Sequence, residues 1–353
     1  MSKPAITVVT WDNIGNVLLG VRLAEANNHY KLDADDPAAL DAAPSFAELF
    51  ADYDVTLYEC KTLEEVEAHI ADADYLVIHK ENLPADVLRN GKKLRLVQHL
   101  GLDYRGVPMD AAREMGIPVA ATPLVNYLAV AEHNWALILD YFKRMPYHRR
   151  FMKERGYVQE GWGAVRSLDI VLACDRTLGL LGLGEIARPM ARYAQAFGMK
   201  TIYWDIRRFP ELEEQYGIEF VSWEDLWSQS DVLSVQIPIK PETHKIIGAK
   251  EFAMMKPSAL FLNTARGKLV DQDALVEALQ SRKIGGAGLD VFYEEPLPED
   301  DPMHTLHEDI SYRVTITPHS AWQGAWTWVR DSLGIWNNVL HNLRGEPLDY
   351  RVE

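Results

Sequence analysis

Short apolar runs alternate with helix-like patterns along the first part of this chain. The apolar runs predict strands at Ala5–Thr10, Val55–Tyr58, Tyr75–His79, Arg95–Leu100 and Pro118–Ala121. The segments between them predict helices at Leu63–Ala71, Pro84–Asn90 and Met109–Met115. Strands that alternate with helices indicate a parallel, doubly wound sheet. Residues from about Gly20 to Asp52 interrupt the pattern, and we interpret this Ala- and Asp-rich stretch with two prolines as a partly helical insertion.

The same alternation returns in the second half and predicts a second α/β domain. Its predicted strands are Thr177–Leu181, Lys200–Trp204, Val232–Gln236, Ala259–Asn263, Gly286–Asp290 and Val314–Thr317. Its predicted helices are an Ala-rich segment that ends at Phe197, Glu224–Gln229, Lys250–Met255 and Gln272–Ser281. A long apolar helix pattern at Tyr127–Tyr141 lies between the two halves, and Trp328–Glu353 is interpreted as a helix with a short tail.

The turn after the strand at Thr177–Leu181 carries a dinucleotide-binding fingerprint. Gly182-Leu183-Gly184-Glu185-Ile186-Ala187 gives G-x-G-x-x-A, in which Gly182 permits the tight turn and Gly184 lets the backbone approach a pyrophosphate. Asp205 ends the next strand, near the spacing at which an acid binds the adenosine ribose, and its charge favours NAD over NADP. Arg207 and Arg208 follow at once, so NADP is not excluded. The alternative is an ordinary strand-to-helix turn.

Three later segments place chemically active side chains just after predicted strands. Arg266 lies in Leu262–Gly267, the acids Glu294 and Glu295 lie in Leu289–Pro296, and His319 lies in Thr317–Trp322. Ligands bind at the carboxyl edge of such a sheet. The arginine fork can hold a carboxylate, and histidine can exchange a proton near neutral pH. This set suits hydride transfer at a carbonyl acid, with a carboxylate that orients the imidazole.

The composition limits the possible partners. The chain has 353 residues, of which 52 are acidic and 36 basic, giving a net charge of −16. So acidic a surface argues against binding to nucleic acid or to an anionic membrane. No predicted membrane-spanning segment or signal peptide is found, and the two cysteines, Cys60 and Cys174, fit a reduced cytoplasm. We expect no metal site, and we interpret the histidines and acids near residues 300–309 as a solvated acidic loop.

Taken together, these motifs resemble the D-isomer-specific 2-hydroxyacid dehydrogenases, the family of D-lactate, glycerate, hydroxypyruvate and phosphoglycerate dehydrogenases. The resemblance covers nearly the whole chain. It rests on LGLDY, MGIPVAATP, Ala131-Glu132-His133, the GLGEIA loop, Gln236-Ile237-Pro238 with Pro241-Glu242-Thr243, NTARG, LDVFYEEP and TPHSAW.

The resemblance implies a two-domain enzyme that closes over its substrate and transfers a hydride between NAD and a small D-2-hydroxy acid or 2-keto acid. Residues 1–125 with 328–353 would form a flavodoxin-like substrate domain, and residues 126–327 a Rossmann NAD-binding domain. The active site would lie in the cleft between the domains. The family likeness also implies a homodimer, for which Tyr127–Val165 is the predicted contact surface.

The resemblance also assigns roles to individual residues. His319 would be the acid/base, Glu295 would orient it, and Arg266 would bind the substrate carboxylate. The choice of Glu295 over Glu294 rests on its position directly before Pro296. Further substrate contacts would come from the backbone of Leu100 and Gly101, from Lys80 or His79, and from Trp322. Cofactor contacts would come from Gly182, Gly184, Glu185, Ile186, Asp205, Pro238, Thr243, Thr264 and Asp290.

Two related protein classes are alternatives. Asn126 ahead of Val130–His133 resembles the formate dehydrogenases of this superfamily, but these carry glutamine where Glu295 stands. Trp322 resembles a tryptophan of the C-terminal-binding-protein corepressors, which leaves an NADH-sensing interaction protein with incidental turnover as the competing function. His133 is interpreted as a structural residue of its helix. The acid that is used and the physiological direction do not follow from the sequence.

Overall fold

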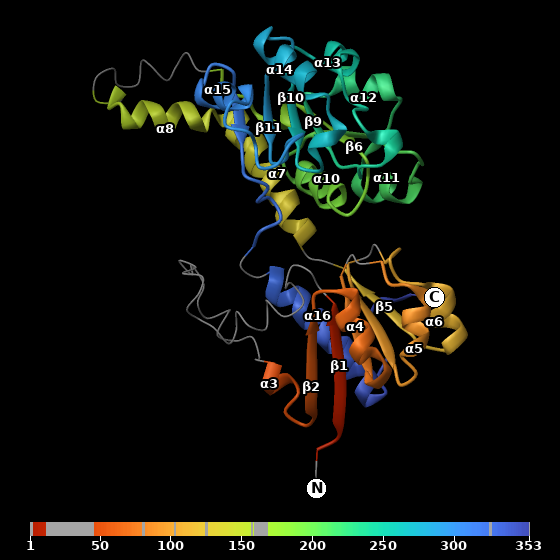
Figure 1. Cartoon of the computed structure of the whole chain (residues 1–353). Helices are drawn as coiled ribbons and strands as arrows, with labels where there is room; N and C mark the ends of the chain where they lie inside the picture. Colours follow the sequence, from red (N-terminus) through yellow and green to blue (C-terminus); the bar gives the residue numbers. More distant parts are fainter. Residues whose placement is uncertain are drawn as a thin grey trace. The chain divides into compact units, whose positions relative to one another are not determined.

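The protein folds into two compact units, each built on one β-sheet whose strands are parallel except for β13 (Arg351–Val352) in unit 1 (Figure 1). Unit 1 comprises Met1–Asn126 and Gly324–Glu353, and unit 2 comprises Tyr127–Gln323. The structure is a computed structural model that describes residues 3–11, 46–79, 82–101, 104–123, 126–156, 158, 169–324 and 327–352. Most of the predicted insertion at Gly20–Asp52 lies outside these residues, as does Lys80.

Unit 1 has a six-stranded sheet in the order β13-β5-β4-β3-β1-β2. All pairs are parallel except β13 with β5. The strands are β1 Ala5–Trp11, β2 Asp54–Cys60, β3 Tyr75–Ile78, β4 Leu96–Leu100, β5 Val119–Thr122 and β13 Arg351–Val352. The helices are α3 Phe46–Leu49, α4 Leu63–His69, η1 Ile70–Asp72, α5 Ala85–Asn90, α6 Met109–Met115 and α16 Thr327–Arg344. The doubly wound sheet predicted from the alternation is confirmed.

Both faces of this sheet are covered at its inner strands β3, β4 and β5, in which every residue is buried. One face packs on α4, α5 and α6 through residues such as Val66, Leu88 and Ala112. The other face packs on α16 through Ile335, Trp336 and Val339. Phe46 of α3 meets Trp336 edge-on, with ring centroids 5.1 Å apart. The last helix of the chain is therefore part of the core of the first unit.

Unit 2 has a seven-stranded, wholly parallel sheet in the order β12-β11-β10-β9-β6-β7-β8. Its strands are β6 Thr177–Leu181, β7 Lys200–Trp204, β8 Glu219–Phe220, β9 Val232–Val235, β10 Leu260–Asn263, β11 Gly286–Leu289 and β12 Val314–Ile316. The order reverses between β6 and β9, so the chain returns to the middle of the sheet, which is the Rossmann arrangement.

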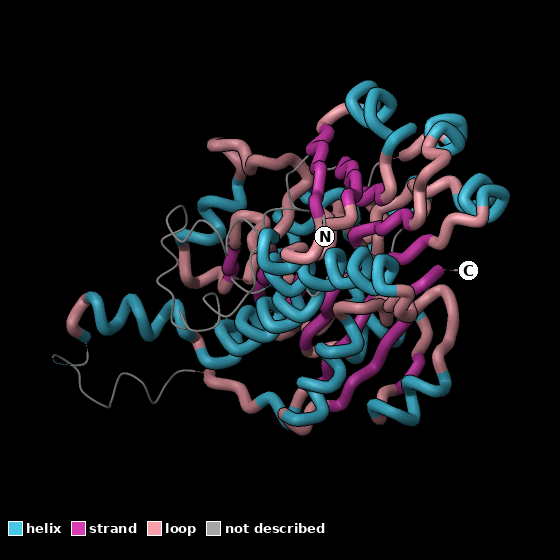
Figure 2. The backbone as a smooth tube through the Cα atoms, turned by 90° about the horizontal axis from the view of Figure 1, so that it is seen from below, coloured by secondary structure: helices cyan, strands magenta, loops and turns pink. Residues whose placement is uncertain are grey.

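Helices cover both faces of this second sheet. Figure 2 marks the helices of both units in cyan and their strands in magenta. One face packs on α12 Trp223–Gln229, α13 Ala249–Met254, α14 Gln272–Gln280 and α15 Pro302–Glu308. The other packs on α7 Asn126–Lys143, α10 Ala187–Ala196 and α11 Pro210–Tyr216. The short helical turns are η3 Ala173–Asp175, η4 Pro241–Thr243 and η5 Gly267–Leu269.

Helix α8, Met145–Lys153, differs from the other long helices because none of its residues is buried. It follows α7 directly and extends away from the sheet of its own unit (Figure 1). Met152 is 61% exposed on it. Among the described residues, no helix is both long enough and apolar enough to span a membrane.

The prediction of a solvated loop near residues 300–309 is wrong. Asp301 caps a helix, because its side chain accepts a hydrogen bond from the Met303 N–H at 2.8 Å. Met303 and Leu306 are each 1% exposed and pack under α14 and β12. The two buried apolar residues three positions apart were the helical signal that the surrounding charges obscured.

Candidate active site

The polar segments of unit 2 gather at one edge of its sheet, because all seven strands run in the same direction. The loops after β6, β7 and β9 carry most of the predicted cofactor-binding residues, while Thr264 and Asp290 directly follow β10 and β11. The loops after β10, β11 and β12 carry Arg266, Glu295 and His319. The carboxyl ends of the strands form the binding edge of this kind of sheet.

The loop after β6 has the shape that a dinucleotide needs. Gly182 has φ +95°, and a Cβ there would lie 2.8 Å from the Gln236 carbonyl oxygen, so only glycine fits. At Gly184 a Cβ would meet no described residue within 4 Å, so this part of the backbone leaves room for a pyrophosphate. Ala187 is fully buried where α10 meets the sheet, and α10 begins without a side-chain cap. These residues fit the cofactor that the fingerprint implies.

Asp205 at the end of β7 is joined to this loop. Its Oδ2 accepts a hydrogen bond from the Leu183 N–H at 2.8 Å, so a carboxylate borders the predicted ribose position. Arg208 forms an ion pair with Glu213 at 2.7 Å, and the Arg207 guanidinium lies 4.4 Å from the Phe209 ring centroid. Both arginines that could bind a 2′-phosphate therefore already have partners.

Behind the cofactor edge lies a buried polar network that links α7 to β9 and β10. Asn134 Nδ2 donates to Thr264 Oγ1 at 2.8 Å, and Ser234 Oγ donates to Asn134 Oδ1 at 3.3 Å. Gln236 Nε2 donates to Ser234 Oγ at 2.9 Å, while its buried Oε1 has no hydrogen-bond partner among the described residues. The hydroxyl of Thr264, a predicted cofactor contact, is thus held inside the protein.

The loop after β9 is shaped by Thr243. Its Oγ1 donates to the Pro238 carbonyl at 2.9 Å and accepts a hydrogen bond from the Lys240 N–H at 2.7 Å. Pro238 is exposed, and so is Glu185 in the glycine loop, whereas Ile186 is half-buried. The side chain of Thr243 therefore fixes the turn on which Pro238 lies.

The three predicted catalytic residues line one hollow of about 570 Å³. Glu294 lies in the same wall, as do five residues that the sequence did not single out, Ile239, Gly267, Lys268, Phe292 and Tyr293. The predicted motifs contain Gly267, Phe292 and Tyr293, but no charge or spacing distinguished them. Gly267 is required because a Cβ there would overlap the Phe292 carbonyl. Asn263 shapes the arginine loop, since its Nδ2 donates to the Arg266 carbonyl at 3.0 Å.

His319 and Glu295 form a direct pair in this hollow. His319 Nδ1 lies 2.7 Å from Glu295 Oε2, and Glu295 Oε1 accepts a hydrogen bond from the Phe292 N–H at 2.9 Å. Partial burial raises the pKa of Glu295, but the Phe292 N–H, His319 and the charge of Arg266 lower it by more. The net pKa lies below the usual range, so the carboxylate stays ionised beside the imidazole. Glu294 has no such contact with His319.

Asp290 organises the turn that carries His319. Its side chain is 1% exposed, and it accepts hydrogen bonds from the Ser320 N–H at 2.9 Å and the Ala321 N–H at 2.8 Å. Trp322 Nε1 donates to the His319 carbonyl at 2.9 Å. The family resemblance assigned Asp290 to the cofactor and Trp322 to the substrate. In this structure both hold the histidine turn, and those ligand contacts stay predictions.

Among the residues predicted in unit 1, Leu100 and Gly101 lie at the end of β4. Leu100 is 2% exposed, and Gly101 has φ +95°. The Gly101 N–H donates to the Thr122 carbonyl at 2.7 Å, and its contact with a substrate carboxylate stays a prediction. His79 is 3% exposed after β3, and Lys80 lies outside the described residues.

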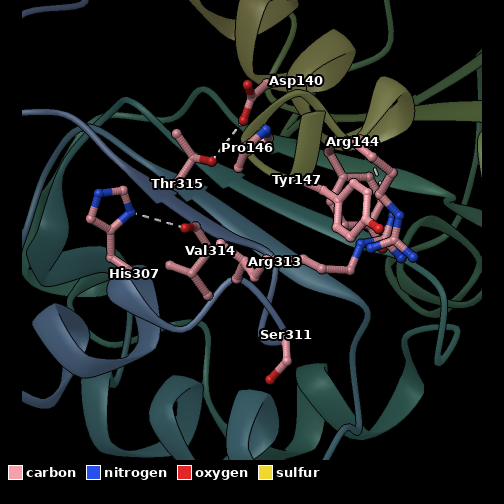
Figure 3. A pocket seen from close by; sticks show the side chains of 11 residues that line it. Asp140, Arg144, Pro146, Tyr147, His307, Ser311, Arg313, Val314 and Thr315 are labelled. Atoms are coloured by element: carbon pink, nitrogen blue, oxygen red, sulfur yellow. Dashed lines mark hydrogen bonds between the residues drawn. The ribbon is translucent and has the colours of Figure 1, made fainter. Parts of the chain in front are cut away.

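A second hollow in unit 2, of about 410 Å³, lies where α7 and α8 meet the start of β12 (Figure 3). Arg144 and Arg313 lie close together in its wall beside Tyr147 (Figure 3). The Arg313 guanidinium stacks on the Tyr141 ring at 3.7 Å, and none of the three predicted catalytic residues lines this hollow. In the part of the chain that the structure describes, no group of three His, Cys, Asp or Glu side chains is arranged to hold a metal ion.

Comparison with known proteins gives a consistent result. The sequence model described as "D-isomer specific 2-hydroxyacid dehydrogenase, NAD binding domain" matches residues 135–321. The glyoxylate reductase of Korarchaeum cryptofilum is 36% identical over 282 residues, which are 78% of this chain and 82% of that protein. The hydroxypyruvate reductase of Blautia hydrogenotrophica is 31% identical over 287 residues, 81% of this chain and 87% of that protein.

Solved structures agree in fold. A glyoxylate reductase from Paecilomyes thermophila has a TM-score of 0.67 at 28% identity and covers 100% of this chain and 99% of its own. The NAD-complexed D-isomer specific 2-hydroxyacid dehydrogenase from Lactobacillus delbrueckii ssp. bulgaricus has a TM-score of 0.70 at 20% identity, with 98% of this chain and 100% of its own covered. At that identity the second likeness speaks for the fold alone.

Proposed function

Because the chain belongs to the D-isomer specific 2-hydroxyacid dehydrogenase family and is an NAD-dependent 2-hydroxyacid oxidoreductase, we propose that His319, Glu295 and Arg266 carry its reaction. The bound nicotinamide supplies or accepts the hydride at the carbon that bears the substrate oxygen. The protein's own residues then have to hold the acid and move one proton.

His319 is the proposed acid/base. Its Nδ1 is paired with Glu295, which leaves Nε2 to exchange a proton with the substrate oxygen. During reduction Nε2–H protonates the oxygen of the keto group, and during oxidation Nε2 takes the hydroxyl proton. The ionised Glu295 holds the ring in one orientation and stabilises the imidazolium form.

Arg266 is the proposed carboxylate ligand. Its guanidinium is permanently charged and planar, so it can bind a carboxylate with two parallel hydrogen bonds. The side chain is exposed and lines the same hollow as His319. A substrate held there by its carboxylate has its keto carbon next to the charged group, which polarises the carbonyl.

The single observation that carries this proposal is the 2.7 Å His319–Glu295 pair in a hollow that Arg266 also lines. The names of the relatives point to the substrate class. Glyoxylate and hydroxypyruvate reductases act on small 2-keto acids, and we propose glyoxylate and hydroxypyruvate as the first substrates to test.

NAD is favoured over NADP in this proposal because of Asp205. A carboxylate at the ribose position repels a 2′-phosphate, and Arg208, which could offset it, is engaged with Glu213. Kinetics with NADH and NADPH in parallel tests the preference.

The proposed function is tested with NADH, NADPH and a panel of glyoxylate, hydroxypyruvate, pyruvate and phenylpyruvate, with His319→Ala as the control. Turnover of a panel member that the substitution abolishes supports both the reaction and the role of His319. Tight NADH binding without turnover of any member overturns the proposal and favours the NADH-sensing alternative.

A homodimer through the predicted surface Tyr127–Val165 is part of the same proposal. Helix α8 lies in this range and buries none of its side chains, although it carries Met145, which is 43% exposed, and the stacked rings of Tyr147 and Phe151. An isolated helix of this length is marginal in water, so a partner surface would stabilise it. Light scattering on the protein and on Met152→Glu tests this surface.

A further inference from the structure

His319 has an unusual backbone conformation for a residue with a side chain. Its φ is +52°, in the left-handed region that few non-glycine residues adopt. It follows Pro318, and its own N–H donates to the Thr317 carbonyl at 3.1 Å. A backbone held this way persists only if the surrounding contacts fix it. The orientation of the His319 imidazole therefore depends on the contacts that hold the backbone of residues 317–321 in place.

The buried carboxylate of Asp290 fixes this turn on both sides of His319. Before the histidine, Thr317 Oγ1 donates to Asp290 Oδ1. After it, the N–H groups of Ser320 and Ala321 donate to Oδ1 and Oδ2 at 2.9 and 2.8 Å. One carboxylate that is 1% exposed thus spans the turn, and its orientation sets the orientation of the turn.

His133 of α7 also belongs to this set of hydrogen bonds, which it joins at the Thr317 hydroxyl. Its Nε2 lies 3.0 Å from Thr317 Oγ1 and 4.0 Å from Asp290 Oδ1. The single hydroxyl proton of Thr317 goes to Asp290, so Thr317 Oγ1 accepts from His133, which must carry its proton on Nε2. Burial lowers the pKa of His133 by more than Asp290 raises it, which favours this neutral form.

We propose that His133 is a positioning residue for His319, and that it acts through the chain of hydrogen bonds from His133 Nε2–H to Thr317 Oγ1 to Asp290. The inference rests on the proposed function, because it concerns the acid/base of that reaction. From the sequence, His133 was interpreted as a structural residue of its helix. In this proposal it instead orients the imidazole of His319.

The alternative is that the contact only docks α7 on β12. The structure offers a matched case for that role. Thr315, on β12 two residues before Thr317, donates to Asp140 Oδ2 at 2.9 Å, and Asp140 also lies on α7 (Figure 3). Thr315 and Thr317 thus each bond through the hydroxyl to a side chain of α7, Thr315 from within β12 and Thr317 from the residue that follows it. Of these two, Thr317 is the one joined to Asp290 and the histidine turn.

The experiment is a single turnover of enzyme-bound NADH with excess 2-keto acid, in which amplitude reports folded enzyme and rate reports the chemical step. We expect His133→Phe and Thr317→Val to slow the rate between about 10-fold and 100-fold with unchanged amplitude and NADH affinity, since small misplacements have costs of this order. Thr315→Val should keep the wild-type rate.

Conservative variants and a double variant sharpen the test. His133→Gln retains an N–H donor and Thr317→Ser retains the hydroxyl, so each should recover most of the rate. The double variant of His133→Phe and Thr317→Val should be no slower than the slower single variant, because both break one chain. A His133→Phe rate within twofold of wild type, or equal slowing in Thr315→Val and Thr317→Val, overturns the proposal.

Failure of the proposed function is recognised separately. If the wild type turns over no acid, crystal structures of the wild type and Thr317→Val still test the positioning role. We expect the Thr317→Val structure to lose the +52° φ at His319 or to lengthen the 2.7 Å distance from His319 Nδ1 to Glu295 Oε2. An unchanged turn overturns the inference without reference to activity.

Discussion

His319 Nδ1 lies 2.7 Å from Glu295 Oε2, and this bond joins the turn after β12 to the loop after β11. The neighbouring Glu294 lines the same hollow but is not bonded to the imidazole. Sequence motif position favoured Glu295, and the geometry now gives the physical reason: only one of the two adjacent carboxylates reaches the ring.

The first prediction concerns this pair. Glu295→Gln keeps the size of the side chain but removes the charge that stabilises the imidazolium, so kcat should fall roughly 10²-fold. Steady-state kinetics with the best 2-keto acid measures it. Glu294→Gln is the matched control and should lose far less. Equal losses in the two variants would contradict the assignment of Glu295.

The second prediction concerns Arg266. Arg266→Lys keeps the positive charge but loses the fork, so kcat/KM for the 2-keto acid should fall by about 10- to 100-fold, the value of one or two charge-assisted hydrogen bonds. The KM for NADH should stay near the wild-type value. Arg266→Ala assayed with added guanidinium provides the check. Recovered turnover would show that the guanidinium group itself is what the reaction needs at this position.

The third prediction concerns cofactor choice. Asp205→Asn keeps an acceptor for the Leu183 N–H but removes the charge that repels a 2′-phosphate. The ratio of kcat/KM for NADH to that for NADPH should therefore fall at least about tenfold, the effect of roughly 1.4 kcal/mol. Wild-type enzyme that uses NADPH as well as NADH, with no change in the variant, would refute this role of Asp205.

The fourth prediction concerns stability and pH. The pKa of His133 is lowered by burial from its ordinary value of 6.5, so the unfolded chain binds this proton more readily than the folded protein does. The stabilising contribution is therefore complete above pH 6.5 and decreases as the pH falls from there through the folded pKa. His133→Gln has no such group. As the pH falls below 6.5, the melting temperature of His133→Gln should therefore drop by less than that of the wild type. The same drop in both proteins would contradict the lowered pKa of His133.

The fifth prediction concerns the two free cysteines. Burial and the charge of Glu65 raise the pKa of Cys60 to about 11, and the side chain is 3% exposed, so it stays a protected thiol. Cys174 is exposed. Native protein treated with iodoacetamide near neutral pH should gain one adduct, at Cys174, by mass spectrometry. A second adduct that forms rapidly at Cys60 would contradict this prediction, because it would show that the core around β2 opens.

Much of the fold follows from the alternation of apolar and polar positions. The strands at Thr177–Leu181 and Lys200–Trp204 have the observed bounds, because their apolar runs are sharply bounded. The helix α15 was missed, since charged neighbours outnumber its two buried residues, Met303 and Leu306. The two-residue strands β8 and β13 have too little pattern of their own to be predicted.

The sequence by itself determined the chemistry available to this protein: the glycine loop with Asp205 at the next strand end, and one arginine, one glutamate and one histidine that each follow a strand. These signals are local, because each depends on a strand and the few residues after it. Tertiary structure decided how they are held. His133 and Thr317 are 184 positions apart, and no local pattern pairs them. Only the packing of α7 beside β12 brings this donor to the turn that aims His319.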